Sequence, residues 1–267
     1  MIPDLVFHVA DGIPLKLDLY LPSVGRDFPL VVWIHGGGWR EGSKQKPPVR
    51  RLVEEGFALA SISYRLTHQA IFPHQLYDCQ RALVWLRSKS GEYGYQSAPP
   101  AVVGCSAGGT LAMLLGCTSR RALYLAPGLG ACSSSLEVRC VVNYFGPSDF
   151  VLRGKTQAEI AYTERSGSFG WLGGRIHGHV DAELEQAASP ALLVDQHMPP
   201  LLLFHGDCDE LVLMDQAEAI EAACRLASRE VHLVRVSGAG HGGGQFFWGQ
   251  NYQTLRQFLM RHFNLGQ

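Results

Sequence analysis

Residues 101–117 constrain the fold more than any other stretch of this chain. A short apolar run, 101–105, leads into a G-x-S-x-G motif at residues 104–108, and a helix-compatible stretch follows. A serine hydroxyl is a poor nucleophile unless it projects at a sharp strand-to-helix turn, where a base and a substrate both reach it. Glycines at both ends of the motif let the backbone crowd together at that turn, since they lack a Cβ atom. The stretch therefore predicts a nucleophilic Ser106, against the plainer interpretation of a glycine-rich turn with an incidental serine.

Apolar runs and helical patterns alternate along the rest of the chain. The predicted strands are 6–9 and 15–21 (an antiparallel hairpin), 30–34, 57–63, 101–105, 139–144, 200–205 and 231–236. The predicted helices are 48–55, 73–91, 109–117, 213–226 and 252–262. Such alternation is typical of an α/β fold with a mostly parallel central sheet and helices on both faces.

The chain length fits one domain. With 267 residues, of which 46% are hydrophobic, the chain can bury a substantial core. Because α/β folds of this size commonly form a single domain, we expect one domain over residues 1–267. Residues 146–188 interrupt the alternation between two predicted core strands and are rich in glycine, serine and polar side chains. We expect them to form a small cap insertion over the carboxyl edge of the sheet, where ligands bind in such folds.

Two further predicted strands end next to candidate acids and a candidate base. Asp207 and Asp209 follow the strand at 200–205, and His241 follows the strand at 231–236 between two glycines. The order Ser, Asp, His is that of a triad in which the histidine takes the serine proton and the carboxylate orients the histidine. We choose Asp209 over Asp207 because the turn must reach toward the histidine loop. Asp207 is then expected to bond local backbone N–H groups.

Residues 35–39 read His-Gly-Gly-Gly-Trp and follow the predicted strand at 30–34 directly. Three successive glycines let backbone amides approach a substrate closely. We expect the N–H of Gly37 or Gly38 to form one half of an oxyanion hole, and the N–H of Ala107 to form the other half. The histidine and the tryptophan at the two ends are expected to pin the loop, the histidine in a structural role.

Charge and hydropathy exclude several classes of function. The formal net charge is −1 and no run of basic residues occurs, so neither nucleic acid nor an anionic membrane is an expected partner. No apolar run reaches transmembrane length. The first residues lack the basic and apolar regions of a signal peptide, which favours the cytoplasm, or secretion if a leader was removed.

Metal and disulfide sites are weakly indicated. The seven cysteines include no C-x-x-C pair. The sequence does not decide whether one disulfide forms, for instance between Cys132 and Cys140. His177, His179 and Asp181 form the best candidate for a metal site. Histidines in a polar, glycine-rich loop are more often solvent-exposed than metal-bound, so we expect no metal.

Together these motifs resemble the esterase/lipase branch of the α/β-hydrolase superfamily that carries a His-Gly-Gly-Gly-Trp loop, and most of all the small bacterial feruloyl and acetyl-xylan esterase-like proteins. The resemblance extends over nearly the whole chain. The matching stretches are 17–22, 35–39, 63–66, 78 with 82–87, 104–109, 145–150, 188–190, 205–209 with 212, and 238–242. One departure is residues 64–68, Tyr-Arg-Leu-Thr-His, where relatives often read Tyr-Arg-Leu-Ala-Pro. It affects the details of the substrate and not the reaction.

The resemblance implies an enzyme without a cofactor. It places the triad on Ser106, Asp209 and His241 and the oxyanion amides on the residues predicted above. The implied activity is hydrolysis of small soluble carboxylic esters through an acyl-enzyme. Acetyl or feruloyl esters of plant saccharides are the substrates that the resemblance suggests.

Pocket residues and alternative functions are less sharply indicated. Trp39, Trp171 and Trp248 are expected to line the substrate pocket, with core packing or a lid hinge as an equally weighted alternative for the last two. An amidase of the arylformamidase type would use a similar glycine loop. A non-catalytic binding protein on a hydrolase scaffold, like the plant gibberellin receptor, would usually lack a triad member. The oligomeric state is not fixed by the sequence.

Overall fold

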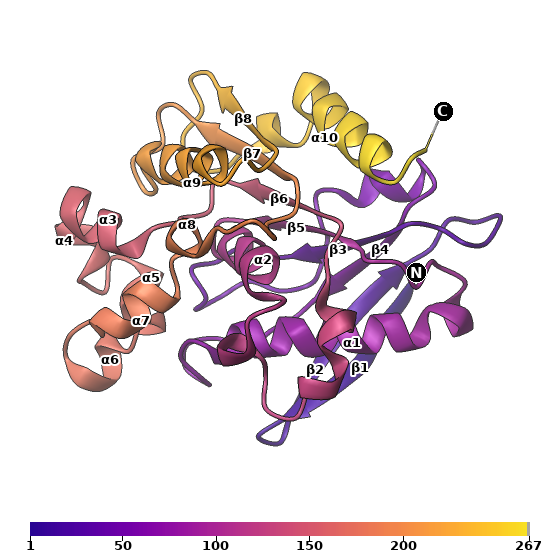
Figure 1. Ribbon diagram of the computed structural model, residues 1–267, viewed down its shortest axis with the longest axis horizontal. Helices are drawn as coiled ribbons and strands as arrows, with labels where there is room; N and C mark the ends of the chain where they lie inside the picture. The colour runs from indigo at the N-terminus through magenta and orange to yellow at the C-terminus, as the bar shows by residue number, and fades with distance from the viewer. Residues whose placement is uncertain (266–267) are drawn as a thin grey trace.

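The computed structural model describes residues 1–265, without the side chains of residues 131–133, and is centred on one sheet. This sheet has eight strands in the order β1-β2-β4-β3-β5-β6-β7-β8 (Figure 1). β2 pairs antiparallel with β1 and β4, and all other neighbours are parallel. The predicted α/β fold with a mostly parallel sheet is therefore confirmed. The strands are β1 (Ile2–Ala10), β2 (Ile13–Tyr20), β3 (Leu30–Ile34), β4 (Ala58–Ile62), β5 (Ala101–Cys105), β6 (Cys140–Tyr144), β7 (Leu201–Gly206) and β8 (Val231–Val236).

Helices cover both faces of the sheet. One face packs against α1 (His74–Tyr93), α2 (Ala107–Thr118) and α9 (Asp215–Leu226). The other packs against α10 (Gly249–His262) and the 3-10 helix η1 (Arg50–Val53). Because side chains alternate along a strand, Val102 of β5 packs in the first core and Val103 in the second. Both are fully buried, as is usual for a central strand of a parallel sheet.

Two helices differ from their predictions. The helix expected at 48–55 is only the single turn η1, because two prolines precede it and Gly56, with φ of +92°, turns the chain soon after it. Helix α1 continues through Gly91, where we expected its end. It ends at Gly94, whose φ of +77° gives the left-handed C-cap that glycine adopts most easily.

Residues 146–188 form several short helices. Three of them begin at a polar side chain that accepts a hydrogen bond from the first turn: Asp149, Ser166 and Asp181. Figure 1 shows these helices gathered on one side of the molecule, away from the two termini. They are α3 (Phe150–Thr156), α4 (Ala158–Ala161), α5 (Gly167–Trp171), α6 (Gly174–His177) and α7 (Ala182–Ala187).

The remaining elements are short. They are η2 (Ala122–Tyr124), η3 (Gly130–Leu136), α8 (Pro190–Leu193) and η4 (Gly244–Phe246). The side chain of Cys132 lies outside the described residues, whereas Cys140 is buried in β6. Within residues 1–265, no helix is both long and apolar enough to cross a membrane.

Candidate active site

Ser106 stands at the turn between β5 and α2. Its backbone has φ of +50° and ψ of −122°, a strained conformation for a residue with a side chain, and its N–H donates to the carbonyl oxygen of Tyr144 (2.8 Å). Glycine is needed on both sides. A Cβ at Gly104 would collide with the carbonyl of Gly108, and a Cβ at Gly108 with the carbonyl of Ile34. The predicted strand-to-helix turn is therefore present, with the serine at its tip.

The three side chains predicted as a triad form one hydrogen-bonded chain. Ser106 Oγ lies 3.0 Å from His241 Nε2, and His241 Nδ1 lies 2.7 Å from Asp209 Oδ2. Because Nδ1–H donates to the carboxylate, Nε2 is left without a proton and accepts from the serine hydroxyl. The residues follow β5, β7 and β8, three strands whose carboxyl ends lie at one edge of the sheet. A hydroxyl, a base and an orienting carboxylate thus meet as nucleophilic catalysis requires.

The two carboxylates that follow β7 have different partners. Asp209 Oδ1 accepts from the backbone N–H groups of residues 211 and 212 (3.0 and 2.9 Å), which leaves Oδ2 for His241. The side chain of Asp209 is fully buried, so these donors replace the water that would otherwise solvate its charge. Asp207 Oδ1 instead accepts from the backbone N–H of Gly238 (2.7 Å), at the start of the histidine loop.

The glycine loop after β3 passes next to the serine. A Cβ added at Gly36 would lie only 3.2 Å from the Cβ of Ser106. Gly37 (φ +111°) and Gly38 (φ +58°) have backbone conformations that favour glycine. In the part of the chain that the structure describes, the N–H groups of Gly37, Gly38 and Ala107 donate to no protein acceptor. These amides are therefore available to an oxygen atom of a bound molecule.

His35 and Trp39 hold the two ends of this loop. The His35 ring stacks on Tyr64 with centroids 4.3 Å apart, and its carbonyl oxygen accepts from the Tyr64 hydroxyl (2.9 Å). Trp39 stacks on Trp171 with centroids 4.0 Å apart and an interplanar angle of 3°. Burial lowers the pKa of His35 to about 4, so the ring is neutral at physiological pH. The contacts of His35 are those of a packing residue.

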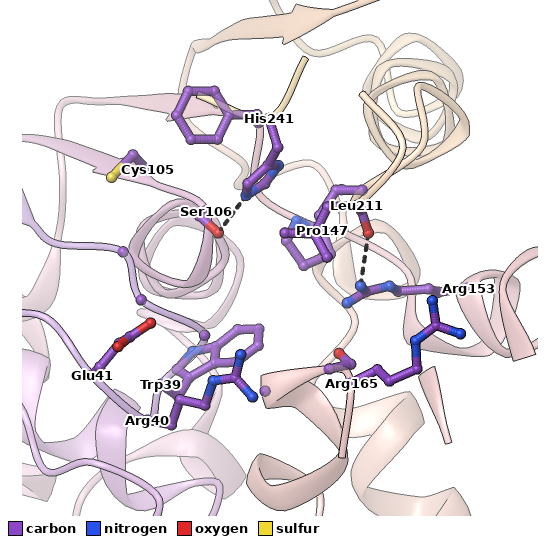
Figure 2. A pocket seen from close by; sticks show the side chains of 17 residues that line it. Trp39, Arg40, Glu41, Cys105, Ser106, Pro147, Arg153, Arg165, Leu211 and His241 are labelled. Carbon is purple, nitrogen blue, oxygen red and sulfur yellow. Dashed lines mark hydrogen bonds between the residues drawn. The ribbon is translucent and has the colours of Figure 1, made fainter. Parts of the chain in front are cut away.

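Ser106 and His241 line a cavity of about 340 Å³ (Figure 2). Trp39 lines this cavity, but the other two predicted pocket residues do not. Trp171 is fully buried, stacked on Trp39, and Trp248 is 59% exposed to solvent outside the cavity. The predictions that Trp171 and Trp248 line the pocket are therefore wrong. Tryptophan occurs both in cores and at surfaces, and its position in the sequence does not show which of the two applies.

The cavity is also lined by charged residues that no sequence motif indicates. Arg40, Glu41 and Arg165 are exposed, whereas Arg153 on α3 is buried. An arginine in a polar segment is expected to be solvent-exposed, so burial of Arg153 becomes visible only in the folded chain. We find no sequence signal that would have identified it.

Two other nucleophile or metal candidates can be judged from their surroundings. Cys105 also lines the cavity, but burial raises the pKa of its thiol to about 12, which keeps it protonated and a poor nucleophile. His177 and His179 are exposed, and His179 Nδ1 contacts the carbonyl oxygen of His177 (3.0 Å). Among the described side chains, no group of three His, Cys, Asp or Glu residues is arranged to hold a metal ion.

Sequence comparison relates the chain to known esterases. Residues 17–224 match the model of the BD-FAE family. The chain is 30% identical over 222 residues to the esterase LipC of Mycobacterium tuberculosis, an alignment that covers 80% of this chain and 53% of LipC. The chain spans about half the length of the curated relatives it matches.

Solved structures share the fold. A truncated carbohydrate esterase from gut microbiota superposes with a TM-score of 0.84 at 23% identity, covering 97% of this chain and 95% of that one. The bifunctional GH43-CE protein of Bacteroides eggerthii gives a TM-score of 0.80 at 27% identity, covering 97% of this chain and 35% of that one. The architecture is that of the α/β-hydrolase fold, as predicted.

Proposed function

This chain belongs to the BD-FAE family of the α/β-hydrolase superfamily, and we propose that it is a serine carboxylesterase acting on small soluble carboxylic esters. The observation that carries the proposal is the hydrogen-bonded chain from Ser106 through His241 to Asp209. Ser106 and His241 line a cavity beside backbone amides that have no protein acceptor among the described residues. The similarity to the esterase LipC supports the same reaction.

In the proposed acylation step, Ser106 Oγ attacks the ester carbonyl carbon while its proton passes to Nε2 of His241. Asp209 stays ionised and stabilises the imidazolium through the hydrogen bond from Nδ1. The carbonyl oxygen becomes an oxyanion, which accepts from the N–H of Ala107 and from the glycine loop. When the ester C–O bond breaks, His241 returns the proton to the leaving alcohol, and the acyl group stays on the serine oxygen.

Deacylation uses the same groups with water as the nucleophile. Water attacks the acyl carbon while His241 takes its proton, and the same amides hold the second oxyanion. The carboxylic acid leaves when the proton returns to Ser106 Oγ. The serine, the histidine, the carboxylate and the amides supply every group that these steps need, so we propose no cofactor.

The cavity limits the size of the substrate. About 340 Å³ is at the small end of ligand pockets, which favours short acyl groups or small alcohols. The motif resemblance suggests acetyl or feruloyl esters of plant saccharides as the specific class, and of these two the small cavity favours the acetyl esters.

We further propose that residues 146–188 act as a small cap within one domain formed by residues 1–267. The cap contacts the glycine loop directly. A Cβ at Gly167 would collide with the carbonyl of Gly38, and Trp171 stacks on Trp39. These contacts place the cap directly against the loop whose amides are proposed to receive the oxyanion.

A substrate panel tests the function against its nearest alternatives. We expect turnover of p-nitrophenyl acetate, p-nitrophenyl butyrate and acetylated or feruloylated saccharides, with a much lower kcat/KM for aryl formamides. A fluorophosphonate probe should label Ser106 in the same preparation. A preference for formamides would favour an amidase of the arylformamidase type. No turnover and no labelling would favour a non-catalytic binding protein.

A further inference from the structure

A buried arginine without a carboxylate partner lines the cavity. Arg153 is 3% exposed, and in the described residues no carboxylate lies within ion-pair distance of its guanidinium. Arg65, which is 5% exposed, follows the usual rule: it bonds both oxygens of Asp78 and also reaches Asp11. Buried charges are normally paired, so Arg153 departs from the usual pattern, which Arg65 follows.

Most of the donor capacity of Arg153 is unused. Nη2 donates to the carbonyl oxygen of Leu211 (2.9 Å), and Nη1 makes a long contact with Ser168 Oγ (3.4 Å). The buried Nε has no acceptor in the part of the chain that is described. A guanidinium carries five N–H groups in a fixed plane, so several remain for a ligand. Figure 2 shows the guanidinium end of Arg153 turned toward the cavity into which Ser106 and His241 open.

The cavity is positively charged although the chain as a whole is not. The net charge of the protein is −1, whereas the cavity lining includes Arg40, Arg153 and Arg165 against one acidic side chain, Glu41. Clefts lined by charge of one sign focus the field on ligands of the opposite sign. The lining therefore favours a substrate with a negative charge.

Burial without a partner destabilises the charged form of Arg153. It lowers the pKa of the guanidinium to about 10, and the negative charges of Asp209 and Asp215 oppose this only in part. The side chain is still cationic at neutral pH. A bound anion would supply the charged partner that Arg153 lacks among the described residues.

We propose that the cavity binds esters that carry a carboxylate, and that Arg153 recognises this carboxylate with assistance from Arg165 at the rim. The inference rests on the proposed esterase function and narrows its substrate class. Two carboxylate oxygens match the planar fork of a guanidinium, and such charge-assisted pairs are stronger than neutral hydrogen bonds. The carboxylate can belong to the acid half of the ester or to its alcohol half, as in an acetylated acidic sugar.

A purely structural role for Arg153 predicts different behaviour. Through the carbonyl of Leu211, Arg153 ties α3 to the loop that also holds Asp209. If this were its whole role, replacing it would slow all esters to the same degree. Recognition of an anion instead changes the ratio between charged and neutral substrates.

Two matched substrate pairs separate these roles. Ethyl hydrogen succinate and ethyl succinamate differ only in a carboxylate or a carboxamide on the acid half. The pair 4-acetoxybenzoate and 4-acetoxybenzamide differs in the same way on the alcohol half. We would measure kcat/KM for both pairs with the wild type, Arg153→Gln, Arg165→Gln and Lys155→Gln. The last variant removes an exposed charge from the same helix, at a residue that does not line the cavity.

We expect the wild type to prefer the carboxylate in at least one pair. Arg153→Gln should reduce the ratio of carboxylate to carboxamide turnover by roughly 10-fold to 100-fold, the effect of losing a hydrogen-bonded charge pair. Arg165→Gln should reduce it by less, because this side chain is exposed. Lys155→Gln should leave the ratio unchanged. Differences in intrinsic reactivity cancel, since each variant is compared with the wild type on the same pair.

The result that overturns the proposal is an equal ratio in the wild type and Arg153→Gln for both pairs, with the neutral esters still hydrolysed. If the thermal melt shows that Arg153→Gln does not fold, the anion site is tested by the substrate ratios of Arg165→Gln and by inhibition of the wild type. Inhibition by succinate but not by succinamide supports the anion site, and equal inhibition contradicts it. If no ester is hydrolysed, the esterase function fails, and calorimetric binding of succinate to the wild type and to Arg165→Gln still decides the anion site.

Discussion

At the scale of single residues, Asp207 and Asp209 are two positions apart and bond different elements. Asp209 is fixed by backbone amides on one oxygen and gives the other to His241. Asp207 bonds the backbone N–H of Gly238 and so braces the loop that carries the histidine. A carboxylate that receives Nδ1–H determines which nitrogen of the histidine carries the proton, and so determines whether the other can act as a base.

Replacing each aspartate by asparagine should separate the two roles. We expect Asp209→Asn to lower kcat/KM on p-nitrophenyl acetate by on the order of a thousand-fold or more, because an amide holds the imidazole in the wrong tautomer. Asp207→Asn keeps an oxygen acceptor for Gly238 and should lose no more than about 10-fold. The reverse ranking would show that the orienting carboxylate is misassigned.

Single residues also mark the limit of sequence reasoning. Strand ends and the reach of the loops indicate Ser106, Asp209 and His241, and the fold brings these side chains together. The burial of Arg153 and Trp171 does not follow from the sequence, because it depends on how the 146–188 segment packs against distant parts of the chain. No local pattern encodes that packing.

At the scale of elements, the glycine loop after β3 is held from both ends. Tyr64 holds the histidine end by stacking and by a hydrogen bond to the His35 carbonyl, and Trp171 holds the tryptophan end. Three consecutive glycines would otherwise make the loop mobile, and mobile amides stabilise an oxyanion poorly. The loop is therefore preorganised by aromatic packing, which includes a residue of the proposed cap.

The buried His35 makes stability depend on pH. In the unfolded chain the imidazole binds a proton near pH 6.5, whereas in the folded protein burial lowers the pKa of His35 to about 4. Stability is therefore complete above about pH 6.5 and falls as the pH drops toward 4, since the unfolded chain binds the proton more readily. The contribution is on the order of 3 kcal/mol.

Melting curves of the wild type and His35→Gln between about pH 7 and about pH 4 would measure this contribution. We expect the wild-type Tm to fall by roughly 5–10 °C more than that of the variant. Burial also lowers the pKa of His205, but His205 is present in both proteins and cancels in the difference. An equal fall in both proteins would contradict the assignment.

Elements were predictable where the pattern is strong and local. The buried strands and the serine turn follow from apolar runs and from glycines whose neighbours leave no room for a Cβ. Helix ends were less predictable. Gly91 lies inside α1, and the helix ends at Gly94, which has the left-handed backbone. Nothing in the local sequence indicates which of the two glycines ends the helix.

At the scale of the whole molecule, one sheet assembles the site from segments far apart in the sequence. The parallel strands β3, β5, β7 and β8 end at the same edge, and the loops after them carry the glycines, the serine, the aspartate and the histidine. Alternating strands and helices predict this edge in advance, because parallel strands need crossover connections. The shape of the cavity was not predictable, since it depends on the fold of residues 146–188.

The proposed hydrolysis of carboxylic esters proceeds through a covalent acyl-enzyme on Ser106. Its most direct test is kcat for p-nitrophenyl acetate with the wild type and Ser106→Ala, together with a melting curve that shows that the variant is folded. Loss of the hydroxyl removes the covalent step, so we predict a fall in kcat on the order of a million-fold, as in comparable triads. A folded Ser106→Ala protein that keeps more than a few per cent of the wild-type rate would show that Ser106 is not the nucleophile.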